Sequence, residues 1–90
     1  MQKGDIVRAL TGHDSGRLYV VLETGESGLL LCNGKQRKLR CPKRKNPRHI
    51  ERLGASMLAE RLERGLATDK EIRTTLAVFN AQEGTRLGKR

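Results

Sequence analysis

Aromatic residues are almost absent from this 90-residue chain, which has one tyrosine, one phenylalanine and no tryptophan. Two rings are too few for the aromatic cage that binds a methylated lysine. Tyr19 is the single candidate for stacking on a nucleobase, and we expect it to pack in the core instead. Long apolar runs are also missing: the longest have five residues, LYVVL and GLLLC, far short of the ~20 that a membrane-spanning helix needs. The start, MQKGDIV, lacks the apolar stretch of a secretory signal, so we expect a cytoplasmic protein without membrane contact.

Cysteine is scarce as well, and the two that occur, Cys32 and Cys41, cannot form a disulfide framework, which suits a reducing compartment. Together with His49 they lack both the paired spacing and the fourth ligand of a zinc site. The chain contains no Ser-His-Asp set, no paired carboxylates in apolar surroundings and no phosphate-binding GxxxxGK loop. We therefore predict no enzymatic activity, no metal, no cofactor and no small-molecule substrate.

Positive charge is abundant, and it is concentrated in one segment. The chain has 19 lysines and arginines against ten acidic residues, a formal net charge of +9. Nine of those 19 and one of the ten fall between Lys35 and Arg52, which leaves ten basic and nine acidic residues for the remainder. A pI near 10.4 leaves three classes of partner: a nucleic acid, an anionic membrane surface or an acidic protein.

The crowding of like charges in this segment favours binding over mere solvation, because their mutual repulsion costs stability unless a polyanion neutralises it. Arginine binds phosphate with a fork of donors, whereas lysine acts as a point charge. The candidate phosphate-binding residues are Lys35, Arg37, Lys38, Arg40, Lys43, Arg44, Lys45 and Arg48.

Short apolar runs cut by turns predict five strands in the first part of the chain: 5–10, 17–23, 28–32, 36–41 and 48–53. In the second strand we expect Leu18, Val20 and Leu22 to face the core. Asn33-Gly34 predicts a two-residue type I′ hairpin into the fourth strand. Pro42 and Pro47 exclude a central strand or a helix between them. Five short strands with short connections favour a small closed antiparallel barrel over residues 3–53.

A helical period follows the strands. Leu58 and Leu62 predict a first helix that ends at Gly65, a residue typical of a helix C-terminus. Thr68-x-x-Glu71 is a capping box that begins a second helix, in which Ile72, Leu76 and Phe79 form one apolar stripe. We predict a helical hairpin over residues 54–83, ten to fourteen residues per helix and packed on the barrel, followed by a flexible tail over residues 84–90.

Residues Gly4 to Leu22 form the strongest local motif: a strand, a loop bracketed by Gly12 and Gly16, a basic residue and a second strand. The glycines let the loop fold back tightly and expose backbone N–H groups, and Arg17 stands at its base, where it can bind a phosphate. An ordinary tight loop would show the same glycines. Asp14 opposes a phosphate in this loop.

This strand–loop–strand pattern resembles the KOW motif of ribosomal proteins and transcription elongation factors. The resemblance extends into NGKQRKLRCPKRKNPRHIE and into the start of the second helix, TDKEIR, where it is similar to small bacterial KOW-domain RNA-binding proteins. It implies an SH3-like barrel and RNA as the ligand, most naturally ribosomal RNA, with ribosomal proteins as further partners. It also implies loop contacts from Gly12 through Arg17, including His13 and Gly16, although many members carry a lysine or arginine where this chain has His13 and Asp14.

The sequence thus predicts a non-catalytic protein that recognises structured RNA through phosphate and shape contacts, because it lacks rings for reading single strands. Two other hypotheses remain. One is an SH3-like protein-interaction module associated with the ribosome or the transcription machinery. The other is DNA binding by the two helices as a helix-turn-helix, which Asp69 and Glu71 at the start of the second helix disfavour.

Overall fold

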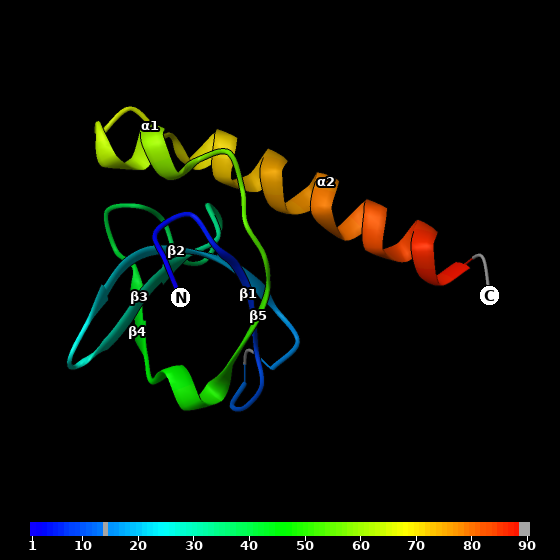
Figure 1. Cartoon of the computed structure of the whole chain (residues 1–90), viewed down its shortest axis with the longest axis horizontal. Coiled ribbons are helices and arrows are strands. Elements are labelled where there is room, and N and C mark those ends of the chain that lie inside the picture. Colours follow the sequence, from blue (N-terminus) through cyan, green and yellow to red (C-terminus); the bar gives the residue numbers. More distant parts are fainter. Residues whose placement is uncertain (14, 89–90) are drawn as a thin grey trace.

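The chain folds as a five-stranded antiparallel sheet followed by two helices (Figure 1). The structure is a computed structural model that describes residues 1–13 and 15–88, and of 83–88 the backbone alone. The elements in chain order are β1 (Ile6–Ala9), β2 (Leu18–Gly25), β3 (Gly28–Cys32), β4 (Lys43–Lys45), the 3₁₀ turn η1 (Pro47–His49), β5 (Ile50–Gly54), α1 (Ala59–Glu63) and α2 (Asp69–Gly88).

The strands lie in the order β4-β3-β2-β1-β5, so β4 and β5 are the two edges. Figure 1 shows the sheet curling until these edges face one another, with η1 linking them below. Within the described residues no ladder joins β4 to β5, so the closed barrel predicted from the sequence is wrong in this respect. The architecture is mostly β with C-terminal helices.

Both faces of the curled sheet carry apolar residues. The concave face holds the inner core, formed by Val7, Ala9, Tyr19, Val21, Leu29, Leu31 and Ile50. The opposite face packs against the helices as the outer core, formed by Ile6, Val20, Cys32, Leu58, Ile72 and Leu76. A strand buried on both faces has no single core face. The predicted core face of β2 is therefore confirmed in part. Val20 is buried in the outer core, with Leu18 and Leu22 half-buried beside it, but Tyr19 and Val21 on the other face are buried in the inner core as well.

The fourth strand also differs from the prediction. Residues 36–41 form a loop, and β4 is the three-residue strand Lys43–Lys45. The type I′ hairpin is absent because Asn33 does not adopt the positive φ that such a turn requires; Gly34 does, at 78°. Instead the Asn33 side-chain oxygen accepts the N–H groups of Lys35 and Arg37, both at 3.0 Å. This asparagine closes a wider loop, and the next strand begins after Pro42.

The helix ends follow their sequence signals, but α1 has five residues and is shorter than the ten to fourteen predicted. The N–H groups of Gly65 and Leu66 bond to the carbonyls of Leu62 and Arg61, the paired bonds of a Schellman C-terminus. Thr68 Oγ1 accepts the Glu71 N–H at 3.2 Å, and Glu71 Oε1 accepts the Thr68 N–H at 3.0 Å, which confirms the capping box. The stripe begun by Ile72 and Leu76 packs on the sheet as predicted.

Helix α2 has 20 residues and is longer than the sequence predicted. Figure 1 shows it projecting past the sheet toward the C-terminus. The flexibility of residues 84–90 stays a prediction, and Lys89 and Arg90 lie outside the described residues. In the described part of the chain, neither helix combines the length and apolar character needed to cross a bilayer.

Candidate nucleic-acid interface

The basic segment begins in the loop between β3 and β4. Its first four cations, Lys35, Arg37, Lys38 and Arg40, are all exposed on this loop. Two contacts hold the loop against the start of α2: the Leu39 N–H donates to Asp69 Oδ1 at 2.8 Å, and Arg73 Nη1 donates to the Gly34 carbonyl at 2.7 Å. These two hydrogen bonds therefore give the loop a defined conformation against α2.

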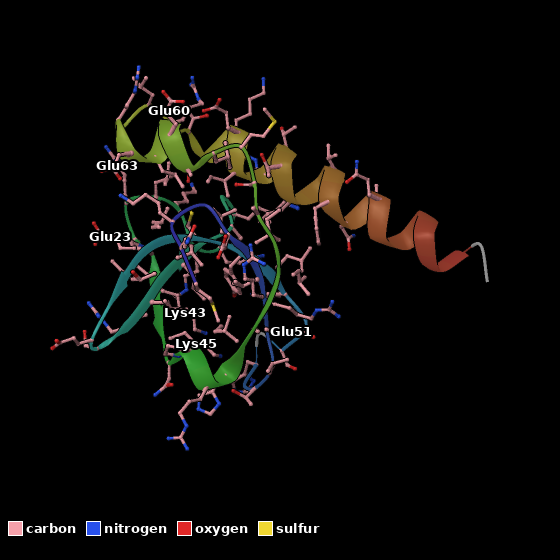
Figure 2. All side chains as sticks on the ribbon, in the orientation of Figure 1. Glu23, Lys43, Lys45, Glu51, Glu60 and Glu63 are labelled. Atoms are coloured by element: carbon pink, nitrogen blue, oxygen red, sulfur yellow. The ribbon has the colours of Figure 1, made fainter. Side chains whose placement is uncertain are left out.

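Strand β4 divides the next three cations between two sides. Lys43 and Lys45 pair in register with Leu31 and Leu29, both inner-core residues, so these lysines point to the concave side. Figure 2 shows both lying within the ring of strands. Lys45 Nζ donates to the Thr11 carbonyl at 2.9 Å, which ties β4 to the loop between β1 and β2. Lys45 thus has a structural partner in the free protein.

Arg44 pairs with Leu30 and points outward from the sheet. Its side chain is exposed and donates to Ser27 Oγ at 2.7 Å. Arg48 is exposed in η1, where the Asn46 side chain caps the turn by accepting the Arg48 N–H at 2.9 Å. The outward cations therefore run from the loop along the β4 edge to η1.

Five carboxylates of the described residues form ion pairs, and none of the five pairs involves an outward cation of the basic segment. The ion pairs join Lys3 to Glu63, Arg8 to Glu51, Arg52 to Asp5, Arg61 to Glu71 and Arg64 to Glu60. Figure 2 shows Glu60 and Glu63 on α1. Within the same residues no carboxylate pairs with Lys35, Arg37, Lys38, Arg40, Arg44 or Arg48. The outward part of the basic segment keeps its uncompensated charge in the folded protein.

The one carboxylate buried in the described core is Asp5, which is 3% exposed. Its Oδ2 accepts Arg52 Nε at 2.9 Å and the Gln2 N–H at 2.8 Å. Arg52, the last cation of the basic segment, therefore stabilises the fold.

The Lys3–Glu63 contact at 2.7 Å raises the pKa of Lys3 and lowers that of Glu63.

The glycine-bracketed loop adopts the tight form that its sequence predicts, with φ of 86° at Gly12 and 88° at Gly16. The N–H groups of this loop are less available than expected: Gly16 N–H bonds to the Ala9 carbonyl at 2.7 Å, and Ser15 N–H to the Gly12 carbonyl at 3.2 Å. His13 and Arg17 are exposed. The expected effect of Asp14 lies outside the described residues. Arg17 is the clearest candidate in this loop for contacting a phosphate.

A groove brings the two predicted contact regions together. Its volume is about 410 Å³, and it lies between the end of the glycine loop, the Asn33–Arg37 turn and α2. Arg17 and Lys35, chosen from separate motifs, both line it. Arg73 of α2 lines it too and was not predicted, although its helical spacing to the buried Leu76 could have placed it beside the sheet. Arg44 and Arg48 do not line this groove.

The first turn of α2 is covered by the loop that contributes Gly34 and Leu39 to the contacts above. A recognition helix must present its N-terminal residues to the major groove of DNA. The packing of Ile72 and Leu76 on the sheet further fixes this helix as part of the fold. This arrangement argues against the helix-turn-helix hypothesis.

The cysteines occupy different environments. Cys32 is buried in the outer core, and burial raises the pKa of its thiol to about 12, with a smaller contribution from the Asp69 carboxylate. Cys41 is exposed, and neither forms a disulfide. Among the described residues no group of three or more His, Cys, Asp or Glu side chains is placed to hold a metal ion.

Comparison with known proteins identifies no relative: neither a protein-family model nor a curated protein matches the chain.

Proposed function

We propose that this protein is a non-catalytic RNA-binding protein that recognises structured RNA, most naturally ribosomal RNA. One observation carries the proposal: the outward cations between Lys35 and Arg48 are exposed and, in the described chain, lie without a partner carboxylate. Phosphate groups spaced along a nucleic acid backbone are the ligand that such a group of cations fits.

The expected mode of recognition is phosphate and shape contact. Tyr19 is 1% exposed in the inner core, and Phe79 packs against the outer core. The chain has no other Phe, Tyr or Trp, so no platform of these rings is available for stacking on splayed bases. Structured RNA presents closely spaced phosphates without requiring stacking, which favours it over an unpaired strand.

We also propose that the curled sheet is an SH3-like barrel of the KOW kind. The order of β1, a tight glycine loop, Arg17 and β2 supports this proposal, as does the antiparallel pairing of β1 with both β2 and β5. The proposed ribosomal proteins among its partners follow from the same resemblance. The proposed cytoplasmic location is supported instead by the two free cysteines, which suit a reducing compartment.

The experiment that tests the RNA proposal reverses two outward cations, Arg40→Glu and Arg44→Glu, in one double variant. Fluorescence anisotropy would measure the Kd for a fragment of folded ribosomal RNA at about 0.1 M salt. Loss of two phosphate contacts, each contributing about 1 kcal/mol, predicts at least a tenfold weaker affinity. Circular dichroism should show an unchanged fold, because neither guanidinium pairs with a described carboxylate.

The matched control is the double variant Lys70→Glu and Arg64→Glu, which changes the net charge equally. Lys70 and Arg64 are exposed on the helical side of the molecule and lie outside the basic segment. Arg64→Glu also removes the exposed ion pair with Glu60, which should cost under 1 kcal/mol of stability. We expect less than a threefold effect from this control, since long-range attraction is screened by salt. Equal weakening by both variants would contradict the site assignment. Absence of RNA affinity in the wild type, with a protein partner retained after nuclease treatment, would instead favour the protein-interaction module.

A further inference from the structure

The groove between the glycine loop and α2 combines three cations with no acidic lining residue. Its cations are Arg17, Lys35 and Arg73, which come from three separate segments. Neither Arg17 nor Lys35 has a side-chain partner among the described residues. Three positive groups converging on one concave surface create a local potential that attracts a compact anion such as a phosphodiester.

Arg73 is held in place by the fold. Its Nη1 donates to the Gly34 carbonyl at 2.7 Å, which orients the guanidinium while leaving its other donors available. A guanidinium fixed in advance loses less side-chain entropy when it binds an anion than a free one does. Helix α2 therefore presents a preorganised cation to the groove.

Amides and apolar side chains complete the lining. Gln36 Oε1 accepts from Asn33 Nδ2 at 2.9 Å, so the Gln36 NH₂ group remains free to donate outward. Asn80 is exposed on α2 and has no partner among the described residues. Leu18, Leu76 and Ala77 also line the groove and supply its apolar surface. Cations, free amides and a small apolar surface match the phosphate, the hydroxyls and the carbon atoms of a sugar–phosphate unit.

One face of α2 makes this contribution. Arg73, Ala77 and Asn80 follow one another at the four- and three-residue spacing that places side chains on one side of a helix. Thr74, Val78 and Gln82 lie on the other side, where they line a separate depression beside Met57 and Leu58. The two sides of the helix can therefore be tested independently.

We propose that this groove seats the sugar–phosphate backbone of one RNA strand, so that α2 is part of the RNA-binding surface as well as a cover for the sheet. The inference rests on the proposed RNA-binding function. It adds Arg73 and Asn80, together with Gln36, to the contact residues, and it joins the glycine loop to the basic segment as one continuous site.

The test places a negative charge in the groove, and its first pair of variants leaves side-chain shape unchanged. Asn80→Asp is isosteric, and Gln82→Glu is its isosteric control on the other side of the same helix. Ala77→Glu and Thr74→Glu form a second pair, in which both positions are exposed and tolerate a good helix former. The Kd for the same folded ribosomal RNA fragment at about 0.1 M salt is the measurement.

A carboxylate beside a bound phosphate predicts about tenfold weaker binding for Asn80→Asp and Ala77→Glu. The two controls should stay within about twofold, because salt screens a charge that faces away from the ligand. Equal affinities within each pair, while Arg40→Glu with Arg44→Glu still weakens binding, would overturn the groove and leave the RNA-binding function standing. A wild type that does not bind RNA would overturn both.

Discussion

The close packing of the β3–β4 loop against α2 can be tested at Gly34. This glycine is buried and has φ of 78°, and a Cβ at this position would overlap the Asp69 carbonyl and approach Cγ of Arg73 to 2.7 Å. Gly16 has nearly the same φ, 88°, but a Cβ there would meet no atom within 4 Å. Comparing the same substitution at the two glycines therefore distinguishes the cost of backbone strain, which both share, from the cost of steric overlap, which only Gly34 has.

Gly16→Ala should lower the free energy of unfolding by about 1 kcal/mol, because the left-handed conformation costs alanine ~1–2 kcal/mol and a less flexible unfolded chain offsets part of it. Gly34→Ala carries the same strain. The added Cβ must also push the loop away from α2, which weakens the hydrogen bond from Arg73 to the Gly34 carbonyl. A hydrogen bond from a charged donor contributes about 1.5–3 kcal/mol to stability. We expect a total loss of about 3 kcal/mol.

Urea denaturation followed by circular dichroism would measure both variants. Asparagine tolerates the left-handed region better than alanine does, so Gly16→Asn should regain most of the lost stability, whereas Gly34→Asn should not, because its Cβ still overlaps Asp69. Losses at the two positions that agree within 0.5 kcal/mol, or recovery at both with asparagine, would refute the close packing of the loop on the helix.

Two further predictions concern buried groups. Because burial raises the pKa of Cys32 to about 12 from an ordinary 9.0, the unfolded chain loses this proton first, and stability should fall by about 1.4 kcal/mol per pH unit between those values. Cys32→Ala should remove this slope, while a maleimide should label only Cys41 in the native protein; equal slopes in both proteins would contradict the thiol's burial. Arg52→Ala should lower the free energy of unfolding in urea by about 1–3 kcal/mol, since it leaves the buried Asp5 carboxylate with one fewer donor. Arg8→Ala, which removes a 3.6 Å contact of the half-buried Arg8 with the exposed Glu51, should cost under 1 kcal/mol. A larger loss for Arg8→Ala than for Arg52→Ala would contradict the greater contribution of the Arg52–Asp5 pair.

Local signals in the sequence predicted much of the fold. The first three strands, the capping box at Thr68 and the helix end at Gly65 depend on nearby residues, and the structure confirms them. The placement of β4 could not be predicted in this way. Pro42 and Pro47 flank β4 and lie outside its three residues. An edge strand needs hydrogen-bonding partners on one side alone, so Lys43–Lys45 can pair with β3 although its composition suggested a loop.

Tertiary arrangement decided the remaining differences. The burial of both faces of β2 follows from the curling of the sheet and the covering helices, which no period in that strand reveals. The inward direction of Lys43 and Lys45 follows from their pairing with Leu31 and Leu29. Residues 17, 35 and 73 line one groove. They are far apart in the sequence and come together only through tertiary packing, so the sequence alone could not predict the groove.

Salt dependence of RNA binding tests the central proposal most directly. If five to seven of the exposed cations each neutralise a phosphate, log affinity plotted against log salt concentration should have a slope of roughly −3.5 to −6. The Arg40→Glu and Arg44→Glu double variant should flatten that slope by about 1.5. A slope near zero for the wild type, or one that these reversals leave unchanged, would contradict the proposal that the basic segment binds an RNA backbone.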